Sequence, residues 1–320
     1  MKKSLINYWV VKPLLLMALS FFLTTACYSS AIHESTISTN HAPDCEVIQH
    51  KLGEICIPFE PKRIIALDPG IIADPLLALG IRPVGIATFS NLQGKEDLAG
   101  LTSDEVEGIA RVGDVIKPSL ERILKLKPDL ILGMYFHEQV YEQLSAIAPT
   151  ILVEEQKDEP IKKYLRYLAQ VLNKEVEAER VLSQYQNQIK KIRGKLNRQP
   201  KEIEVTVLVY YSGSFYLSRT EDSPHQIFSD IGLTDNISET FSPISIETID
   251  KYDADILFIM DYDAKPTSFF LQNPLIASLN AVKNNRAYVI EAEKWHSGGI
   301  LGLNKMPGDL EKYLIEEKGE

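Results

Sequence analysis

The chain has 320 residues, with 34 Lys or Arg against 44 Asp or Glu, so its formal net charge at pH 7 is −10. This acidic balance excludes the basic surface that nucleic-acid binding requires. The hydrophobic content of 45% is enough for a globular protein with two cores.

The first 26 residues have the pattern of an export signal. Three lysines make the start positive, and residues 13–23 form an apolar run that is too short to span a bilayer comfortably. The small residues 24–26 suit cleavage; the alternative is a buried N-terminal helix. No later run is long enough for a membrane span. With residues 1–26 assigned as a signal peptide, 31 basic and 44 acidic residues remain, a net charge of −13.

The segment after this signal carries a candidate lipid site. Ala26-Cys27 resembles the cleavage site of bacterial lipoproteins, in which the cysteine is lipid-modified. Such sites prefer Leu three residues before the cysteine; here that position is Thr24, with Leu23 one place earlier. The resemblance implies a lipid anchor at Cys27. Residues 27–44 are polar and lack periodicity, so we expect a flexible tether.

Cys45 and Cys56 flank a hairpin pattern whose turn is expected near His50–Gly53. A hairpin of this length brings its ends together, so a disulfide is geometrically reasonable, and an oxidising compartment would keep it. The alternative is two buried free thiols. The spacing excludes a CxxC-type metal site. We assign residues 45–60 to this hairpin.

A long helix is expected from about Lys174 to Leu196, and we assign residues 173–197 to it. Asn173 is expected to cap its start, and Pro200 prevents its continuation. About 23 helical residues would extend roughly 34 Å. One apolar stripe follows from three- and four-residue steps between Ala178, Leu182, Tyr185, Ile189, Ile192 and Leu196.

The flanks of this helix are similar to each other. Each side is expected to contain a Ser-capped helix, a short turn and an apolar strand. The residues Ser119, Glu121, Ile123, Lys125 and Asp129 recur in the same register as Ser245, Glu247, Ile249, Lys251 and Asp255. Two similar α/β units joined by one helix is the simplest account, with chance similarity as the alternative. We assign residues 61–172 to an N-terminal lobe and 198–320 to a C-terminal lobe.

Strand and helix patterns alternate along both lobes, which is typical of parallel sheets covered by helices. The last helix is expected at about 308–316. In such sheets, ligands bind beyond the carboxyl ends of the strands. Aromatic and charged residues collect at these ends, including Asp68, Phe89, Tyr135, Phe136, His137, Tyr211, Tyr262 and Trp295. Two facing lobes would bring them into one cleft.

Enzyme signatures do not occur in the sequence. It has no GxGxxG, no GxSxG and no HExxH, and its six histidines are scattered. No His and carboxylate cluster suggests a metal site. We therefore assign no catalytic residue, no metal site and no cofactor. An exported α/β metal-dependent hydrolase remains the alternative from another class.

Five segments resemble the periplasmic ferric-siderophore-binding proteins of ABC importers: residues 57–67, 74–86, 112–113, 118–133 and 147–150. The resemblance extends over nearly all of the chain after Pro43. It implies the class III periplasmic binding protein fold, in which two Rossmann-like α/β lobes are joined by a single backbone helix. It also implies a monomer without catalysis that delivers a ferric siderophore to an inner-membrane permease, with iron present only in that ligand. Vitamin B12 and haem carriers share the fold and are the alternatives.

The resemblance implies two kinds of site. The cleft set contains Arg111, Tyr135, His137, Tyr211, Arg219 and Trp295. Arg groups suit carboxylate or catecholate oxygens, and aromatic rings suit flat ligand faces. Each of these residues has the alternative of an ordinary solvated or core side chain.

The second site is the permease contact, for which the family uses one acidic residue per lobe. Asp74 matches that position in the first lobe, although a carboxylate at a helix start can also serve the helix dipole. In the second lobe the matching position is Ser229. Asp230 or Asp222 is therefore expected to substitute for the acid there.

Overall fold

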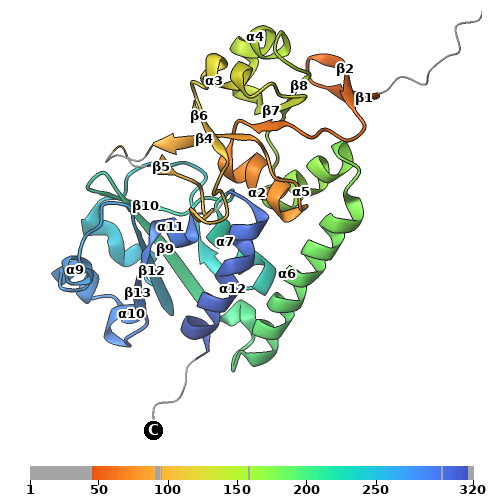
Figure 1. Cartoon of the computed structure of the whole chain (residues 1–320). Coiled ribbons are helices and arrows are strands. Elements are labelled where there is room, and N and C mark those ends of the chain that lie inside the picture. Colours follow the sequence, from red (N-terminus) through yellow and green to blue (C-terminus); the bar gives the residue numbers. More distant parts are fainter. Residues whose placement is uncertain (1–44, 91–93, 95, 158, 297, 316–320) are drawn as a thin grey trace, which may run out of the picture. The chain divides into compact units, whose positions relative to one another are not determined.

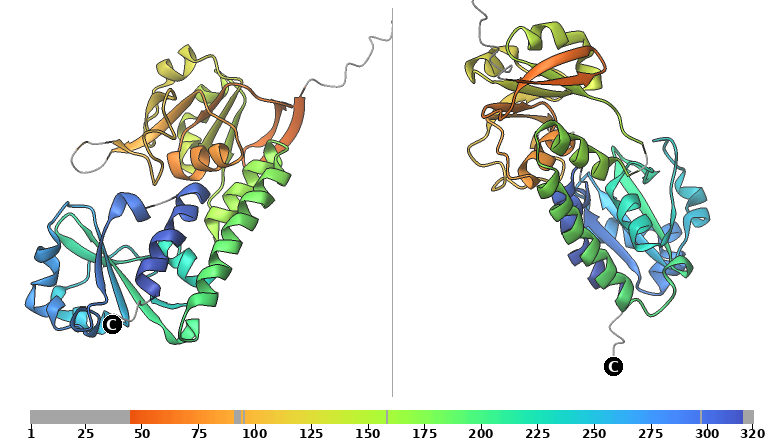
Figure 2. Two further views of the ribbon diagram at one scale, coloured as in Figure 1. Left: turned by 60° about the horizontal axis from the view of Figure 1, so that its bottom comes forward. Right: turned by 90° about the vertical axis from the view of Figure 1, so that its right-hand side faces the viewer.

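The computed structural model describes residues 45–90, 94, 96–157, 159–296 and 298–315. These residues belong to one compact unit, in which two sheets flanked by helices are connected through a long helix (Figures 1 and 2). The predicted signal peptide and the whole predicted tether, Cys27 included, lie outside the described residues. Within the part of the chain that is described, no helix is long and apolar enough to cross a membrane.

The described chain begins with the expected hairpin. Strands β1 (Cys45–His50) and β2 (Gly53–Pro58) pair antiparallel, and Val47 lies opposite Cys56. Cys45 and Cys56 form a disulfide with their Cα atoms 5.5 Å apart. Both the hairpin and the disulfide are therefore confirmed.

The first sheet has the strand order β5-β4-β3-β7-β8, with β6 paired to β4. All of its pairs are parallel except β4–β5. Its strands are β3 (Ile64–Ala66), β4 (Gly85–Ser90), β5 (Glu96–Asp97), β6 (Ala110–Asp114), β7 (Leu130–Met134) and β8 (Thr150–Val153). Every residue of β3, β7 and β8 is buried, because helices cover both faces of a parallel sheet.

The helices of this first lobe are short except for the last one. They are η1 (Pro69–Ala73), α2 (Asp74–Ala78), α3 (Leu120–Lys125), η2 (Tyr135–Val140), α4 (Tyr141–Ser145) and α5 (Pro160–Val171). The first of these, η1, is a π-helical turn that continues directly into α2. Gly80 follows them with φ of +78°, the left-handed conformation that ends helices.

Helix α6 (Glu175–Lys195) is the long helix, with the predicted stripe from Ala178 to Ile192 buried. The predicted cap at Asn173 is wrong. Asn173 has φ of +55°, and its side-chain amide donates to Glu46 of the hairpin at 2.9 Å. Its side chain therefore connects the start of α6 to the hairpin and accepts no N–H group of the first helical turn. The N-cap position of α6 is Lys174, whose side chain makes no capping hydrogen bond either.

The second sheet has the order β10-β9-β12-β13, with β11 paired to β9; only β9–β10 is antiparallel. Its strands are β9 (Glu204–Tyr211), β10 (Ser214–Leu217), β11 (Thr234–Asn236), β12 (Ile256–Asp261) and β13 (Ala287–Glu291). Its helices are η3 (Pro200–Glu202), α7 (Ser223–Ile231), η4 (Ile246–Tyr252), α8 (Thr267–Leu271), α9 (Pro274–Ala277), α10 (Asn280–Lys283), α11 (Ala292–Trp295) and α12 (Ile300–Leu314).

The internal repeat has a structural equivalent at two aspartates. Asp129 precedes β7 and accepts backbone N–H groups of Lys62 and Arg63 at the start of β3, at 2.7 and 2.8 Å. Asp255 precedes β12 and accepts the N–H of Glu204 at the start of β9, at 3.1 Å. Each carboxylate therefore fixes the beginning of the neighbouring strand in its own sheet.

The repeat is less regular at the serines. Ser119 accepts the N–H of Arg122 and caps α3, as expected. Ser245 does not cap its helix, because its hydroxyl donates to the Glu247 carboxylate. The second helix is correspondingly a 3-10 helix, η4.

Helix α12 starts eight residues before its predicted start at Gly308, and the expectation is corrected accordingly. Pro307 lies inside the helix and is buried, so a residue that normally ends helices packs into the core here.

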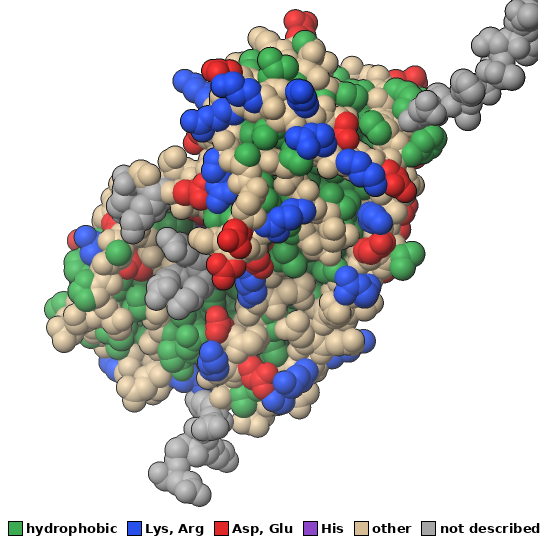
Figure 3. All heavy atoms as spheres, in the orientation of Figure 1, with side chains coloured by type: hydrophobic (Ala, Val, Ile, Leu, Met, Phe, Trp, Pro, Cys, Tyr) green, Lys and Arg blue, Asp and Glu red, His purple; other side chains and the backbone are tan. Residues whose placement is uncertain are grey.

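On the face that Figure 3 shows, acidic and basic side chains are interspersed, with apolar side chains between them.

Candidate functional site

Both lobes line a cavity of about 550 Å³, within the usual range for small-molecule sites. The ends of β4 and β7 contribute Ser90 and Met134 from the first lobe. The ends of β9 and β12 contribute Tyr211 and Met260 from the second. The prediction that the carboxyl ends of both sheets face one cleft is therefore confirmed.

Aromatic rings form walls on both sides of the cavity. Tyr135 and Phe136, at the start of η2, are partly exposed, with ring centroids 5.3 Å apart and nearly perpendicular planes. Opposite them, Tyr211 makes edge contacts with Phe241 at 6.4 Å and Tyr262 at 5.8 Å. Such rings offer apolar faces to a bulky ligand.

Phe241 is held in place by two neighbours. It stacks on Tyr216 at 4.1 Å with an interplanar angle of 3°, and the guanidinium carbon of Arg219 lies 5.5 Å from its ring centroid. Phe241 is 46% exposed and is one of the residues that line the cavity. Phe241 lies in a loop before η4, and no sequence pattern marks it as a cleft residue.

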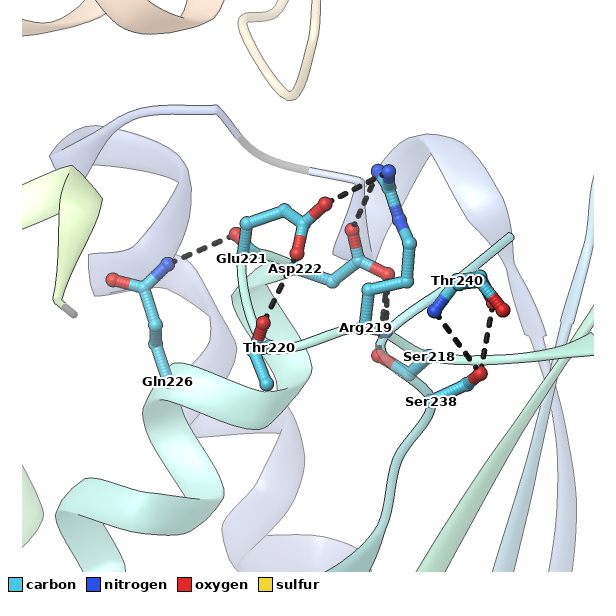
Figure 4. A network of polar contacts seen from close by, with 8 residues as sticks. All are labelled: Ser218, Arg219, Thr220, Glu221, Asp222, Gln226, Ser238 and Thr240. Carbon is cyan, nitrogen blue, oxygen red and sulfur yellow. Dashed lines mark hydrogen bonds and ion pairs between the residues drawn. The ribbon is translucent and has the colours of Figure 1, made fainter. Parts of the chain in front are cut away.

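Arg219 lies in the cleft, as predicted, but its charge is already paired (Figure 4). Nη1 contacts Oε1 of Glu221 at 2.8 Å, and Nη2 contacts Oδ1 of Asp222 at 3.3 Å. The other Asp222 oxygen accepts the backbone N–H of Arg219 at 2.8 Å and the Ser218 hydroxyl. Asp222, the residue before α7, is therefore engaged within its own loop, with both carboxylate oxygens already bonded.

Acidic side chains exceed basic ones among the described residues that line the cavity. Asp97 and Glu155 come from the first lobe, and Glu221 and Asp222 from the second. His296 lies with Nδ1 3.5 Å from Asp97 Oδ2. Desolvation opposes its protonation, but the neighbouring Asp97 carboxylate outweighs this and raises the pKa of His296. Neither Glu155 nor His296 was singled out from the sequence.

Trp295 borders the cavity from inside the core. Its ring is fully buried and packs against Phe258 at 4.6 Å and Phe228 at 6.3 Å. Trp295 therefore borders the cleft to which the sequence analysis assigned it, but it does so as a core side chain that packs against the aromatic residues of β12 and α7.

His137 is a structural residue. Its Nδ1 accepts the backbone N–H of Met134 at 2.9 Å, and its Nε2 lies 2.6 Å from the carbonyl oxygen of Val115. Burial lowers the pKa of this ring, which favours the neutral form that donates from Nε2. The ring is buried in the first lobe and does not line the cavity, so its predicted ligand contact is corrected.

Arg111 is also outside the cavity lining. It forms a two-point ion pair with Glu96, at 2.5 and 3.0 Å, and donates to the carbonyl oxygen of Ile109 at 2.9 Å. These partners keep its guanidinium at the β5–β6 edge of the first sheet. Arg111, which the sequence analysis assigned to the cleft, is therefore not part of the cavity lining in this structure.

The two acids predicted to contact a permease are both engaged inside the protein. Asp74 is 0% exposed and accepts N–H groups at the start of α12, from Leu301 at 2.8 Å and Gly302 at 3.1 Å. Asp230 pairs with Lys162 at 2.6 Å and accepts the Tyr185 hydroxyl at 2.6 Å. A buried carboxylate cannot meet a partner's arginine, so Asp74 is corrected to a helix-capping residue.

Within the described part of the chain, no group of three or more His, Cys, Asp or Glu side chains is arranged to hold a metal ion. The described polar residues that line the cavity are instead one arginine, one histidine, four acids, three tyrosines besides Tyr135 at the start of η2, two serines and one glutamine: Arg219, His296, Asp97, Glu155, Glu221, Asp222, Tyr164, Tyr211, Tyr262, Ser90, Ser223 and Gln156.

Comparison with known proteins agrees with this architecture. The profile of a family described as periplasmic binding protein matches residues 64–293. The chain is 29% identical to the probable siderophore-binding lipoprotein YfiY of Bacillus subtilis, with 96% of this chain and 99% of YfiY covered. It is 30% identical to the Fe(3+)-citrate-binding protein YfmC of the same organism, with coverages of 87% and 88%.

A solved structure shows the same fold with a ligand. Staphylococcus aureus SirA complexed with staphyloferrin B is similar with a TM-score of 0.70 and 26% sequence identity, covering 85% of this chain and 100% of SirA. The arrangement of two α/β lobes joined by one long helix is the class III architecture of such proteins.

Proposed function

The chain belongs to the periplasmic binding protein family, and we propose that it binds a ferric siderophore in the cleft between its lobes and delivers it to an ABC permease. The observation that carries the proposal is the cavity of about 550 Å³ at the strand ends of both lobes, walled by Tyr135, Tyr211 and Phe241. Neither the family nor these relatives are named as enzymes, and we assign no catalytic step to this chain.

The chemistry of the walls suits a chelated metal. A siderophore supplies the oxygen ligands of its own ferric ion, so the protein has to offer shape, apolar surface and a few polar groups. Aromatic rings from both lobes provide that surface, and Tyr211 and Tyr262, which also line the cavity, each carry a hydroxyl group. Iron then enters as cargo and not as a resident cofactor.

Fluorescence titration tests the proposal directly. Trp295 is the single tryptophan after residue 26, and its ring borders the cavity. Ferric siderophores absorb in the near ultraviolet, so we expect strong quenching of Trp295 and co-elution of the complex in size exclusion. Vitamin B12 and haem serve as comparison ligands. Quenching by either of these, without retention of any ferric complex, would overturn the proposal in favour of the same-fold carriers.

We propose that the mature chain is a periplasmic protein anchored by lipid on Cys27. Support comes from the Ala26-Cys27 site and from YfiY, which is named a lipoprotein. Detergent partitioning of the wild type and a Cys27→Ala variant provides the test. The variant is expected in the aqueous phase with unchanged ligand binding. If the wild-type protein also partitions into the aqueous phase, and mass spectrometry finds no acyl chain on it, the proposed lipid anchor is contradicted.

Delivery to a permease is supported by YhfQ of Bacillus subtilis, a putative ABC transporter substrate-binding lipoprotein that is 29% identical over 99% of this chain. Because Asp74 is buried, we propose that Asp74 supports transport only through the lobe structure. The transport activity of the wild type and of variants is measured as the uptake of radioactive iron by cells that depend on this protein. We expect the loss of uptake in an Asp74→Asn strain to match its loss of folded protein.

A further inference from the structure

We propose that the cleft selects ferric siderophores that are neutral or positively charged and discriminates against polyanionic ones. The inference rests on the proposed function and narrows it to a class of ligand. Three singly charged hydroxamates neutralise Fe³⁺, and an added ammonium group makes the complex cationic. Three doubly charged catecholates leave it with a triple negative charge. The net charge of the cavity wall therefore decides which class is admitted.

Carboxylates face the cavity from both lobes. Asp97 and Glu155 belong to the first lobe, and Glu221 and Asp222 to the second. Among the described lining residues, the only groups that offset them are Arg219 and a protonated His296. The described wall is thus negative whichever form His296 adopts. A concave surface with low-dielectric walls concentrates such a field in its interior.

Arg219 does not present an open fork to an anion. Its two terminal nitrogens already meet Glu221 and Asp222, and Asp222 is itself held by the Arg219 backbone and Ser218 (Figure 4). A bound carboxylate or catecholate would compete with Glu221 and Asp222 for these nitrogens, and an exchange with Glu221 would leave that acid unpaired beside the ligand. The exchange replaces one ion pair by another and adds a repulsion.

Arg111 does not compensate. Its guanidinium is paired with Glu96 at two points and lies outside the cavity lining. The pair of arginines that would be needed to grip an anion from both lobes is therefore absent from the described wall.

The aromatic walls accept positive charge. An ammonium group near the face of a Tyr or Phe ring is attracted by the ring electrons. Tyr135 and Phe136 on one side, and Phe241 on the other, are partly exposed towards the cavity. Together with Glu155 and Glu221, they form a wall suited to an apolar ligand with a cationic arm.

Calorimetric titration of the full mature protein tests the inference with three ferric complexes: a tris-hydroxamate with an ammonium arm, the same tris-hydroxamate acetylated at that arm, and a tris-catecholate. We expect affinity to decrease in this order. Raising the salt concentration is expected to weaken binding of the ammonium form and not of its acetylated partner.

Charge-removing variants locate the effect. Glu155→Gln and Glu221→Gln are each expected to weaken the ammonium complex by about two- to fivefold and to strengthen the tris-catecholate, as partly exposed charge pairs do. Glu121→Gln removes the same charge from α3, outside the cavity lining, and is expected to change neither affinity. Circular dichroism of each variant verifies folding.

The outcomes are distinct. Tighter binding of the tris-catecholate than of both hydroxamates, or equal effects of Glu221→Gln and Glu121→Gln, would overturn the charge selection while leaving siderophore binding intact. Failure of all three complexes to bind would instead overturn the proposed function.

Discussion

The carboxylate of Asp74 accepts the backbone N–H of Leu301 at 2.8 Å, across 227 residues of sequence. Asp74 opens α2 in the first lobe, and Leu301 lies in the first turn of the last helix of the chain, α12. Gly299 lies against Asp74 so closely that an added Cβ would be 2.1 Å from its Cγ. Only glycine permits this approach. The start of α12 in the second lobe is therefore capped by a side chain of the first lobe, Asp74.

This buried cap predicts a pH dependence of stability. Burial raises the pKa of Asp74 to about 7, against an ordinary 3.8, although both N–H bonds lower it. The folded state therefore holds a proton that the unfolded state has lost, and its stability falls as pH rises through about 7. We expect the wild type to lose about 2–3 kcal/mol of unfolding free energy between pH 5 and pH 8 from this group.

Urea unfolding of Asp74→Asn at both pH values measures the effect. Asparagine cannot ionise, so the variant should show a smaller difference between the two pH values, at a lower overall stability because its amide meets an N–H donor. Asp104→Asn, at an exposed position, is the control and should retain the wild-type difference. The same pH difference in Asp74→Asn as in wild type would refute the assignment. Asp68, whose pKa burial raises to about 6, contributes with the same sign in both proteins.

The pair Lys162–Asp230 predicts strong coupling between α5 and α7. Both side chains are largely buried and lie 2.6 Å apart, with the Tyr185 hydroxyl on the second carboxylate oxygen. Lys162→Met should cost about 3–5 kcal/mol of unfolding free energy, because it leaves a buried unpaired carboxylate. Adding Asp230→Asn should recover most of this, since the amide oxygen still accepts from Tyr185. Purely additive effects in this double-mutant cycle would show that the two charges do not interact.

The aromatic wall predicts a loss of affinity on truncation. Tyr211→Ala and Phe241→Ala should each weaken binding of the cognate ferric complex by about 5- to 30-fold, as expected for about 1–2 kcal/mol of lost apolar contact. Phe59→Ala, at an exposed phenylalanine outside the cavity lining, is the matched control. Titration by Trp295 quenching provides the values. Unchanged affinity in both wall variants would place the ligand elsewhere.

For Arg111 we expect no loss of ligand affinity on truncation, in contrast to the aromatic wall residues. Because its side chain is paired with Glu96 away from the cavity, Arg111→Ala should leave ligand affinity within about twofold of wild type and cost about 0.5–1 kcal/mol of stability. Calorimetry and thermal unfolding of the same sample measure both quantities. A tenfold loss of affinity would restore Arg111 to the ligand site.

The sequence determined the elements whose signals are local. The apolar stripe of α6 follows from a spacing of three and four residues, and the hairpin with Cys45 and Cys56 follows from alternation around one turn. Asp129 and Asp255 appeared as a repeat because each precedes a strand in the same register, and each binds the start of the neighbouring strand. The strand ends that line the cleft were also accessible, since parallel strands present their carboxyl ends at one edge.

Only the tertiary structure decided which polar side chains are available to a ligand or partner. The sequence does not distinguish Arg219, which lines the cavity, from Arg111, which does not. Nor does it distinguish the buried Asp74 from an acid on the surface. Their roles depend on partners such as Leu301, 227 residues from Asp74, or Glu96, which reaches Arg111 across the sheet edge. A charged group is free or engaged according to the groups that surround it after folding, and periodicity along the chain carries no information about those neighbours.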